Sequence, residues 1–370
     1  MAAAGIDVLV TQTNNAKVGG YVKYLTDVPA YAYFTAVVFP IDGPMTVVTH
    51  GPIDGEQALP PEGDGLWRGV GRVLTTAGFP SIVQSNELDA ARVVDALRGH
   101  KRSRIGLLGQ LQVSHSLGSR LREAFPGARL VDASDLVDTI KAVKSPEEQE
   151  LVRRCARLQD EAMAEVAAAI SPGMKDHDVV SLARHACERR GAEDGVYLCG
   201  SAPPGAPTPP LPPHLRNRAI EPGDLVSLLI ESNGPGGMYT ELGRTFVVGA
   251  VPDALEAELE FAIEAQRFTV DLLRPGASTG QIWTAYNEFM LEHDRPPENR
   301  LHAHGQGYDL VERPLIRDDE PMPLAAGMNI VVHPGYLRKG YWAWICDNWL
   351  LDGNGPGDRL HSYPQELVRV

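Results

Sequence analysis

Basic residues are in short supply in this chain. Lysine and arginine number 34 against 48 aspartates and glutamates, the formal net charge is −14, and no stretch is dense in lysine or arginine. Nucleic acids and anionic membrane surfaces attract clustered positive charge, so both are poor candidate partners for this chain. The charge balance therefore excludes two large classes of binding function.

Long apolar runs are missing as well. No apolar stretch approaches the roughly 18 residues of a membrane-spanning helix. The opening residues MAAAGIDVLVTQ lack the basic start and the long apolar core of a secretory signal. We therefore expect no membrane partner and a cytoplasmic location.

Cysteine is rare too. The four cysteines stand at positions 155, 187, 199 and 346, with neither a CxxC pair nor the spacing of a disulfide framework. In a reducing compartment disulfides are not expected, so each cysteine either fills the core or carries a thiol with a specific task.

The 370 residues, 43% of them hydrophobic, suffice for two domains. Residues 1–140 alternate strand-like runs such as AVVFP and RIGLLG with helix-like runs such as SLGSRLREAF. That alternation predicts an α/β domain with a partly parallel sheet. Ser145 and Pro146 are suited to the N-cap and first turn of a long helix. A second domain is accordingly expected over residues 141–370.

An internal repeat runs through the second domain. AAISPGMKDHDVVSLARHACERRG resembles DLLRPGASTGQIWTAYNEFMLEHD, which places Gly173 and Gly276 in matching positions 103 residues apart. Two glycine-led strands follow, from Gly223 and from Gly327, and these are 104 residues apart. The spacings predict a duplicated unit, pseudo-twofold symmetry and a site where the two halves meet.

A proline-rich segment separates the two halves. Seven prolines occur between positions 203 and 213, just before His214. One interpretation is a rigid surface loop. The other is a stiff rim that holds His214 at the pocket, since proline limits the entropy lost in positioning it.

Several motifs, in their order along the chain, resemble those of the creatinase/prolidase/aminopeptidase P family. They are KSPEEQELVRR, PPHLRNRAIEPGDLVSLL, GGMYTELGRTFVVG, HAHGQGYDL, AAGMNIVVHPGY and ICDNWLLDG, and the resemblance covers nearly the whole chain. It implies an α/β N-terminal domain like that of creatinase. An α+β catalytic domain of the pita-bread fold, with its pseudo-twofold repeat, is expected to follow.

The resemblance also implies where metal ligands would lie. Metallopeptidases of this family bind two metal ions through two aspartates on a strand pair, a histidine in an HGxG turn and two glutamates on the last strands. Aligned by the motifs, the first aspartate falls on Ile230, which cannot bind a metal. The other four places hold residues that are expected to bind one metal ion: Glu241, His304, His333 and Cys346.

Glu231, next to Ile230, does not repair this loss unless the strand carries a bulge, because adjacent strand residues point to opposite faces. A thiolate, two imidazoles and one carboxylate suit Zn²⁺, or alternatively Fe²⁺, better than Mn²⁺. The predicted cofactor is therefore one divalent ion, zinc or iron, and a metal-free pocket is the alternative.

The metal-free alternative follows from the creatinase branch, which uses a histidine as proton shuttle at the place of His214. The glutamate that this branch carries two residues beyond Glu241 is Gly243 here, which argues against creatine as the substrate. The second histidine of the peptidase pocket falls on Val311, which argues against an ordinary Xaa-Pro peptidase. His214 and Glu312 survive and are the expected catalytic residues.

Three further residues are expected to bind the substrate. Arg313 and Arg317 follow the HGQG turn, where creatinase-like enzymes use an arginine for the substrate carboxylate; solvated or ion-paired arginines are the alternative. Tyr33 lies in the aromatic-rich segment YVKYLTDVPAYAYF, and in this family a segment near that place closes the pocket of the partner subunit. A core-packed stretch would account for the same pattern. The resemblance accordingly implies a homodimer.

The expected activity is hydrolysis of a C–N bond in a small polar or carboxylate-bearing substrate, with one metal ion and with His214 as proton shuttle. A lyase and a metal-free, creatinase-like enzyme are alternatives within the same fold. A pita-bread domain that has lost catalysis and serves as a binding module is the alternative from another class.

Overall fold

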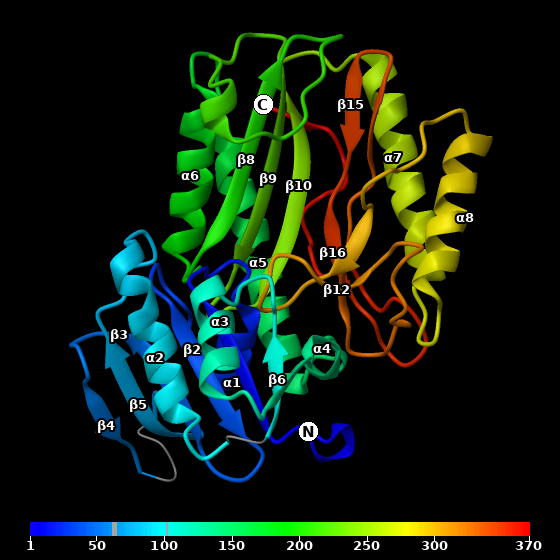
Figure 1. Ribbon diagram of the computed structural model, residues 1–370. Helices are drawn as coiled ribbons and strands as arrows, with labels where there is room; N and C mark the ends of the chain where they lie inside the picture. Colours follow the sequence, from blue (N-terminus) through cyan, green and yellow to red (C-terminus); the bar gives the residue numbers. More distant parts are fainter. Residues whose placement is uncertain (61–64, 101–102) are drawn as a thin grey trace. The chain divides into compact units, whose positions relative to one another are not determined.

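The computed structural model describes residues 1–60, 65–100 and 103–370. The chain forms two compact units, Met1–Lys141 and Ala142–Val370 (Figure 1). Among the described helices, none combines the length and the apolar character that spanning a bilayer requires. Each unit has its own sheets and helices and is described by itself.

Within its described residues, the first unit has one mixed sheet of seven strands in the order β4-β5-β3-β2-β1-β6-β7. Its strands are β1 (Val8–Thr13), β2 (Thr35–Pro40), β3 (Met45–His50), β4 (Glu56–Ala58), β5 (Val70–Thr76), β6 (Arg104–Leu108) and β7 (Arg129–Asp132). Its helices are α1 (Gly20–Thr26), α2 (Asn86–Ala96), α3 (His115–Ala124) and α4 (Ser134–Lys141). The pairs β1–β6, β6–β7 and β3–β5 are parallel, so the partly parallel α/β unit predicted from the sequence is confirmed.

The second unit, described throughout, holds two four-stranded sheets and a hairpin. One sheet consists of β8 (Gly195–Ala202), β9 (Leu225–Asn233), β10 (Tyr239–Val247) and β17 (Val368–Arg369). The other consists of β11 (Ala303–Gly305), β12 (Glu312–Leu315), β13 (Asn329–Val332) and β16 (Asp347–Leu350). The hairpin is β14 (Gly335–Arg338) and β15 (Tyr341–Trp344).

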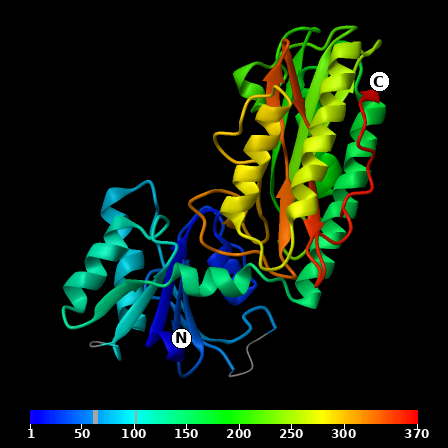
Figure 2. The same ribbon diagram turned by 90° about the vertical axis from the view of Figure 1, so that its right-hand side faces the viewer.

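Two pairs of helices enclose these sheets. α5 (Pro146–Ala169) and α6 (Asp176–Glu188) pack on β8–β10, whereas α7 (Asp253–Leu272) and α8 (Thr279–Glu292) lie on the side of β13 and β15. Figures 1 and 2 show the strands between the two helix pairs. This layering is the pita-bread arrangement, in which the inner faces of the two sheets are left for a site.

The start of α5 follows from local chemistry. The Ser145 hydroxyl accepts a hydrogen bond from the Glu148 amide at 3.2 Å, and the Glu148 carboxylate accepts one from the Ser145 amide at 2.8 Å. This reciprocal capping, together with Pro146 in the first turn, satisfies backbone donors that would otherwise lack partners.

The internal repeat is visible in the backbone. Gly173 and Gly276 both have positive φ angles, +94° and +86°, where a side chain would strain the chain. The amide of Gly173 donates to the Ile220 carbonyl at 2.8 Å, and that of Gly276 donates to the Leu324 carbonyl at the same distance. The two halves therefore repeat the same helix–turn–helix and the same contact with the segment that precedes β9 or β13, which confirms the predicted pseudo-twofold repeat.

A buried ion pair joins the two sheets. Arg244 on β10 is 1% exposed and donates to the Asp347 carboxylate at 2.8 Å, where β16 begins. The same guanidinium donates to the carbonyls of Gly243 at 2.7 Å and Cys346 at 3.0 Å. Gly243 and Cys346 also form a β-bridge, so β10 and β16 lie side by side. The two halves of the repeat thus share one continuous inner surface.

We expect Asp347→Ala to lower the free energy of unfolding by about 3–5 kcal/mol, because it leaves the Arg244 charge buried without a counter-charge. Urea denaturation followed by tryptophan fluorescence measures this loss. Asp319→Ala is the matched control, since it removes an exposed ion pair with Arg317 and should cost less than about 1 kcal/mol. Equal losses for the two variants would show that the sheets do not depend on the buried pair.

Candidate metal centre

Successive side chains of β9 point alternately to the helix-covered face and to the inner face of the sheet. Leu228 and Ile230 pack in the core that α5 and α6 form with the sheet. Because strand residues alternate in direction, Leu229 and Glu231 face the opposite, inner side. Leu229 there joins an apolar cluster that includes Val331 of β13. The inner side of β9 is therefore the side on which the two sheets meet.

Glu231 lies directly opposite Glu241 in the antiparallel pairing of β9 with β10. The register is regular over the whole pair, with no bulge, and Ile230 pairs instead with Leu242, on the other face. The sequence prediction that Ile230 takes the first ligand place is therefore wrong. Spacing along the chain does not fix which side chains share a face, because the pairing of the strands does. Both carboxylates of the strand pair are present after all.

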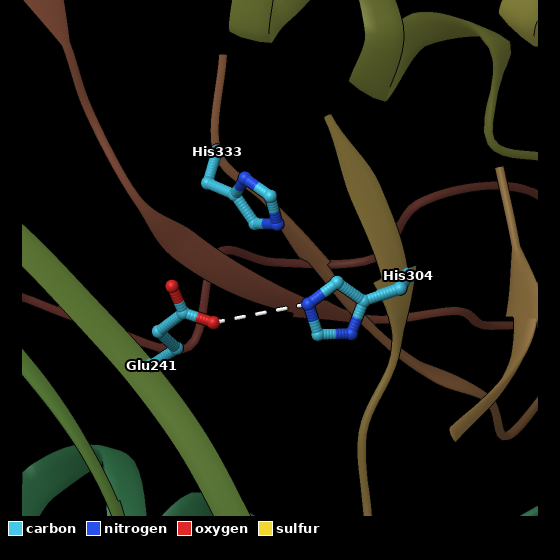
Figure 3. A group of neighbouring side chains, drawn as sticks. All are labelled: Glu241, His304 and His333. Atoms are coloured by element: carbon cyan, nitrogen blue, oxygen red, sulfur yellow. Dashed lines mark ion pairs between the residues drawn. The ribbon is translucent and has the colours of Figure 1, made fainter. Parts of the chain in front are cut away.

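Three side chains from three parts of the fold meet on this inner surface. Glu241 comes from β10, His304 from β11 and His333 from the end of β13, and their ligand atoms all lie within 4.8 Å of one another (Figure 3). The Glu241 Oε2 lies 3.9 Å from the His304 Nε2. The two imidazole rings are 5.2 Å apart and inclined by 63°. The three groups point toward one common space.

The hydrogen bonding of His304 defines what it presents to that space. Its Nδ1 lies 2.9 Å from the Gly305 carbonyl, so this nitrogen carries the proton and donates. Burial, and next the neighbouring His333, lower the pKa of His304 to about 3. The ring is therefore neutral at pH 7, and its Nε2 presents a lone pair to the Glu241 carboxylate. Two electron-pair donors that face each other in this way fit a cation between them.

The charge balance leads to the same conclusion. Burial, and next the charge of Glu241, raise the pKa of Glu231 well above its usual range. Across the described residues, neither Glu231 nor Glu241 forms an ion pair with lysine or arginine. A buried carboxylate without a counter-charge is costly, and a divalent ion would remove that cost. Two imidazoles and one carboxylate are a donor set that suits Zn²⁺ or Fe²⁺.

The comparisons with known proteins agree with this chemistry. Residues 150–357 match the model of the family described as metallopeptidase family M24. The chain belongs to this family. It is 25% identical to the Xaa-Pro dipeptidase of Pyrococcus furiosus over 278 residues, which cover 71% of this chain and 75% of that protein. It is 26% identical to the creatinase of a Bacillus species over 268 residues, which cover 69% and 62% of the two chains.

A solved structure supports the fold of this M24 chain. The X-Pro aminopeptidase of Thermotoga maritima superposes with a TM-score of 0.80 at 18% identity, over 100% of this chain and 97% of that one. The fold class predicted from the sequence is therefore confirmed. The curated relatives are named as hydrolases, so the lyase alternative has no support from them.

Cys346 does not join the three ligands in the M24 chain. It lies outside the group found among the described residues, and its Sγ donates to the Glu241 carbonyl at 3.5 Å. Burial, followed by the charge of Glu241, raises the pKa of this thiol well above its usual range. Packing against Leu229 and Trp344 explains the burial. Cys346 is therefore a protonated thiol in an apolar cluster here, and the predicted set of four ligands is reduced to three.

His214 lies on the opposite face of the sheet. It is exposed, in the short 3₁₀ turn Pro213–Leu215, and it lines a surface depression with Arg184 of α6 and Tyr197 of β8. Tyr197 pairs across the strands with Ile230, which places it on the outer face. The structure therefore does not bring His214 to the three ligands, and the interpretation as a rigid surface loop agrees with this geometry; the role as proton shuttle stays a prediction.

Glu312 has a structural partner. Its Oε2 accepts a hydrogen bond from the Lys144 ammonium at 2.8 Å, and both side chains are 2% exposed. Glu312 Oε1 accepts a further bond from the Asp309 amide at 3.1 Å. A buried carboxylate held in this way anchors the turn after His304 to the start of the second unit. These contacts favour a scaffold role for Glu312, and its catalytic role stays a prediction.

The two arginines expected at the substrate are ion-paired. Arg313 Nε donates to both carboxylate oxygens of Glu320, at 3.0 and 3.1 Å. Arg317 donates to Asp319 at 2.8 and 2.9 Å on the surface. The alternative interpretation, ion-paired arginines, is therefore the one that the structure favours.

Tyr33 belongs to the first unit. Its ring stacks on His50 with centroids 4.0 Å apart, Phe79 packs edge-on against it, and 37% of the side chain is exposed. This aromatic group fits the core-packed interpretation as well as the functional one. A role at the pocket of a partner subunit stays a prediction, as does the homodimer.

Two amide side chains at the centre were not predicted. Gln306 donates to the Glu231 carboxylate at 2.9 Å, and Asn348 donates to the Gln306 Oε1 at 2.8 Å. Both are fully buried. In the sequence, Gln306 stands out only as a polar residue inside HGQG, and Asn348 only as a polar residue within ICDNWLL. The fold alone shows that the two side chains meet.

We expect Cys346→Ser to retain zinc with an affinity within about threefold of the parent protein, because the thiol is not a ligand. His333→Ala should weaken zinc binding by more than about 100-fold, since a lost ligand costs more than a lost supporting contact. Competition with a chromophoric chelator measures both affinities, and His214→Ala serves as a histidine control on the outer face. A large loss in Cys346→Ser would restore the thiol to the ligand set.

Proposed function

We propose that this M24 chain hydrolyses a C–N bond in a small polar or carboxylate-bearing molecule, with one divalent metal ion, zinc or iron, held by Glu241, His304 and His333. The observation that carries the proposal is the meeting of two imidazoles and one carboxylate around a common space, beside carboxylates that form no ion pair with a lysine or arginine of the described residues. Relatives named as an Xaa-Pro dipeptidase and a creatinase support the reaction class.

A divalent ion at this place would polarise a substrate oxygen and lower the pKa of a bound water. The residues of the chain supply the geometry for that chemistry. His304 is held as the Nδ1–H tautomer by the Gly305 carbonyl, which keeps its Nε2 lone pair directed at the centre. Burial of His304 and Glu241 excludes most solvent, so electrostatic interactions with the substrate are strong.

Arg300 is the proposed residue for a substrate carboxylate, in place of Arg313 and Arg317. It is exposed, and the structure shows no ion pair for it among the described residues. After burial and His333, the charge of Arg300 also lowers the pKa of His304, and it opposes the rise in the pKa of Glu231. A planar guanidinium without an internal partner is suited to bidentate binding of a carboxylate.

An ordinary Xaa-Pro dipeptidase activity is not proposed. Val311, at the place of the second pocket histidine implied by the resemblance, is 43% exposed and has no group that could hold a tetrahedral intermediate. His214 has no proposed part in proton transfer, because it is exposed on the outer face. The substrate is therefore sought among small amides, N-carbamoyl and N-acyl amino acids rather than among proline dipeptides alone.

We expect protein purified without added metal to contain about one zinc or iron ion per chain, because Glu241, His304 and His333 form a single centre among the described residues. EDTA should abolish hydrolysis across a panel of proline dipeptides, creatine, N-carbamoyl and N-acyl amino acids, and the same metal should restore it. Elemental analysis and product detection by mass spectrometry provide the two readouts. Activity that survives EDTA in protein without stoichiometric metal would replace this proposal by the metal-free mechanism.

Arg300→Ala should raise KM for a carboxylate-bearing substrate by more than about 10-fold while changing kcat less, because a charge-assisted bond to the bound carboxylate is lost. The carboxamide analogue of the same substrate should respond much less. Steady-state kinetics of both compounds measure the difference, with Arg317→Ala as the control for a surface arginine. Equal effects on the carboxylate and the carboxamide would argue against direct recognition.

A further inference from the structure

We propose that Gln306 limits the metal centre to a single ion, because its side-chain amide lies where a second cation would be held by Glu231 and Glu241. This inference rests on the proposed metal function and concerns the number of ions that the centre binds. The carboxylates of Glu231 and Glu241 by themselves would allow a second ion. Gln306 is 0% exposed and follows β11 two residues after His304. Its side chain therefore reaches the same inner surface as the ligands.

The carboxylates of Glu231 and Glu241 share one amide group. Gln306 Nε2 lies 2.9 Å from Glu231 Oε1 and 3.4 Å from Glu241 Oε2. A primary amide has two N–H donors, so it can serve both carboxylates at once. Two carboxylates directly opposite each other on paired strands would otherwise be an oxygen site for a second divalent ion.

A network of amides determines which end of Gln306 faces the carboxylates. Its Oε1 accepts from Asn348 Nδ2 at 2.8 Å, and that nitrogen also donates to Asn329 Oδ1 at 3.0 Å. Asn348 Oδ1 in turn accepts from the Glu241 backbone amide at 2.8 Å. Rotating the Gln306 amide would set oxygen against the carboxylates and nitrogen against another donor. The N–H groups are therefore held toward Glu231 and Glu241.

Glu241 lies between the two environments. Its Oε2 is 3.9 Å from the His304 Nε2 and 3.4 Å from the Gln306 Nε2. On the histidine side the neighbours offer lone pairs, which attract a cation. On the glutamine side the neighbour offers N–H groups, which repel a cation and occupy the carboxylate lone pairs. The centre therefore takes one ion at the histidines, and Glu231 is held by the amide instead of by a second metal.

This assignment gives a different reason for a mononuclear centre from the one that the sequence suggested. The sequence indicated that a ligand was lost at Ile230, yet the carboxylate is present as Glu231. The second position is blocked by a hydrogen-bond donor and not by a missing ligand. Removing that donor should therefore open it.

The test compares metal stoichiometry in the full chain, Gln306→Ala and Gln159→Ala. Gln159 is a matched control: it is 0% exposed and donates to the Ser232 and Thr240 carbonyls of the same strand pair, at 3.1 and 2.7 Å. Each protein is stripped, loaded with Zn²⁺ or Co²⁺, freed of excess metal by gel filtration and measured by elemental analysis. The parent and Gln159→Ala should bind about one ion per chain. Gln306→Ala should bind about two, because the carboxylates of Glu231 and Glu241 are then free to hold a second ion.

The outcomes separate this inference from the function on which it rests. Parent protein without bound metal would contradict the proposed function itself. One ion in both the parent and Gln306→Ala would overturn the role of Gln306 and leave the function intact, and two ions in Gln159→Ala would point to general loosening of the strands. Calorimetric titration of the parent with Zn²⁺ gives a test that needs no variant: one class of site supports the inference, and two classes overturn it.

Discussion

A buried guanidinium between two strands holds the second unit together. On one face of the β10–β16 junction, Arg244 donates hydrogen bonds to the Asp347 carboxylate and to two backbone carbonyls. Glu241 projects from the other face. Removing Asp347 would leave the Arg244 charge buried without its partner, which costs far more than losing an exposed pair. Because β10 and β16 come from the two halves of the internal repeat, this contact also creates the surface on which the ligands meet. The geometry of the metal centre therefore depends on an ion pair behind it.

The centre itself has the opposite electrostatic character. Its carboxylates face inward without lysine or arginine partners among the described residues, and burial makes their charges costly. Neutral amides satisfy part of their hydrogen-bonding capacity but add no positive charge. His304, whose Nε2 presents a lone pair, completes a site that is short of one cation. The same low dielectric would make a bound ion and an approaching substrate dipole interact strongly.

Much of the fold could be predicted, because its signals are local. The helix start at Ser145 and Pro146 and the matching turns at Gly173 and Gly276 depend on a few neighbouring residues, and each forms as expected. Part of the site followed from motifs as well, since His304 and His333 stand in short segments whose role does not depend on exact counting. The prediction failed where a residue's place depends on a partner strand or on the path of a loop.

The sequence by itself determined the pita-bread fold and pointed to Glu241, His304 and His333, because helix caps, glycine turns and motif order are written along the chain. Tertiary structure alone decided that Glu231, and not Ile230, faces the centre, since cross-strand register selects the face that a side chain occupies. It also decided that Cys346 is packed among apolar side chains. Burial, alternation and partner geometry arise only when distant segments meet, and no local pattern carries them.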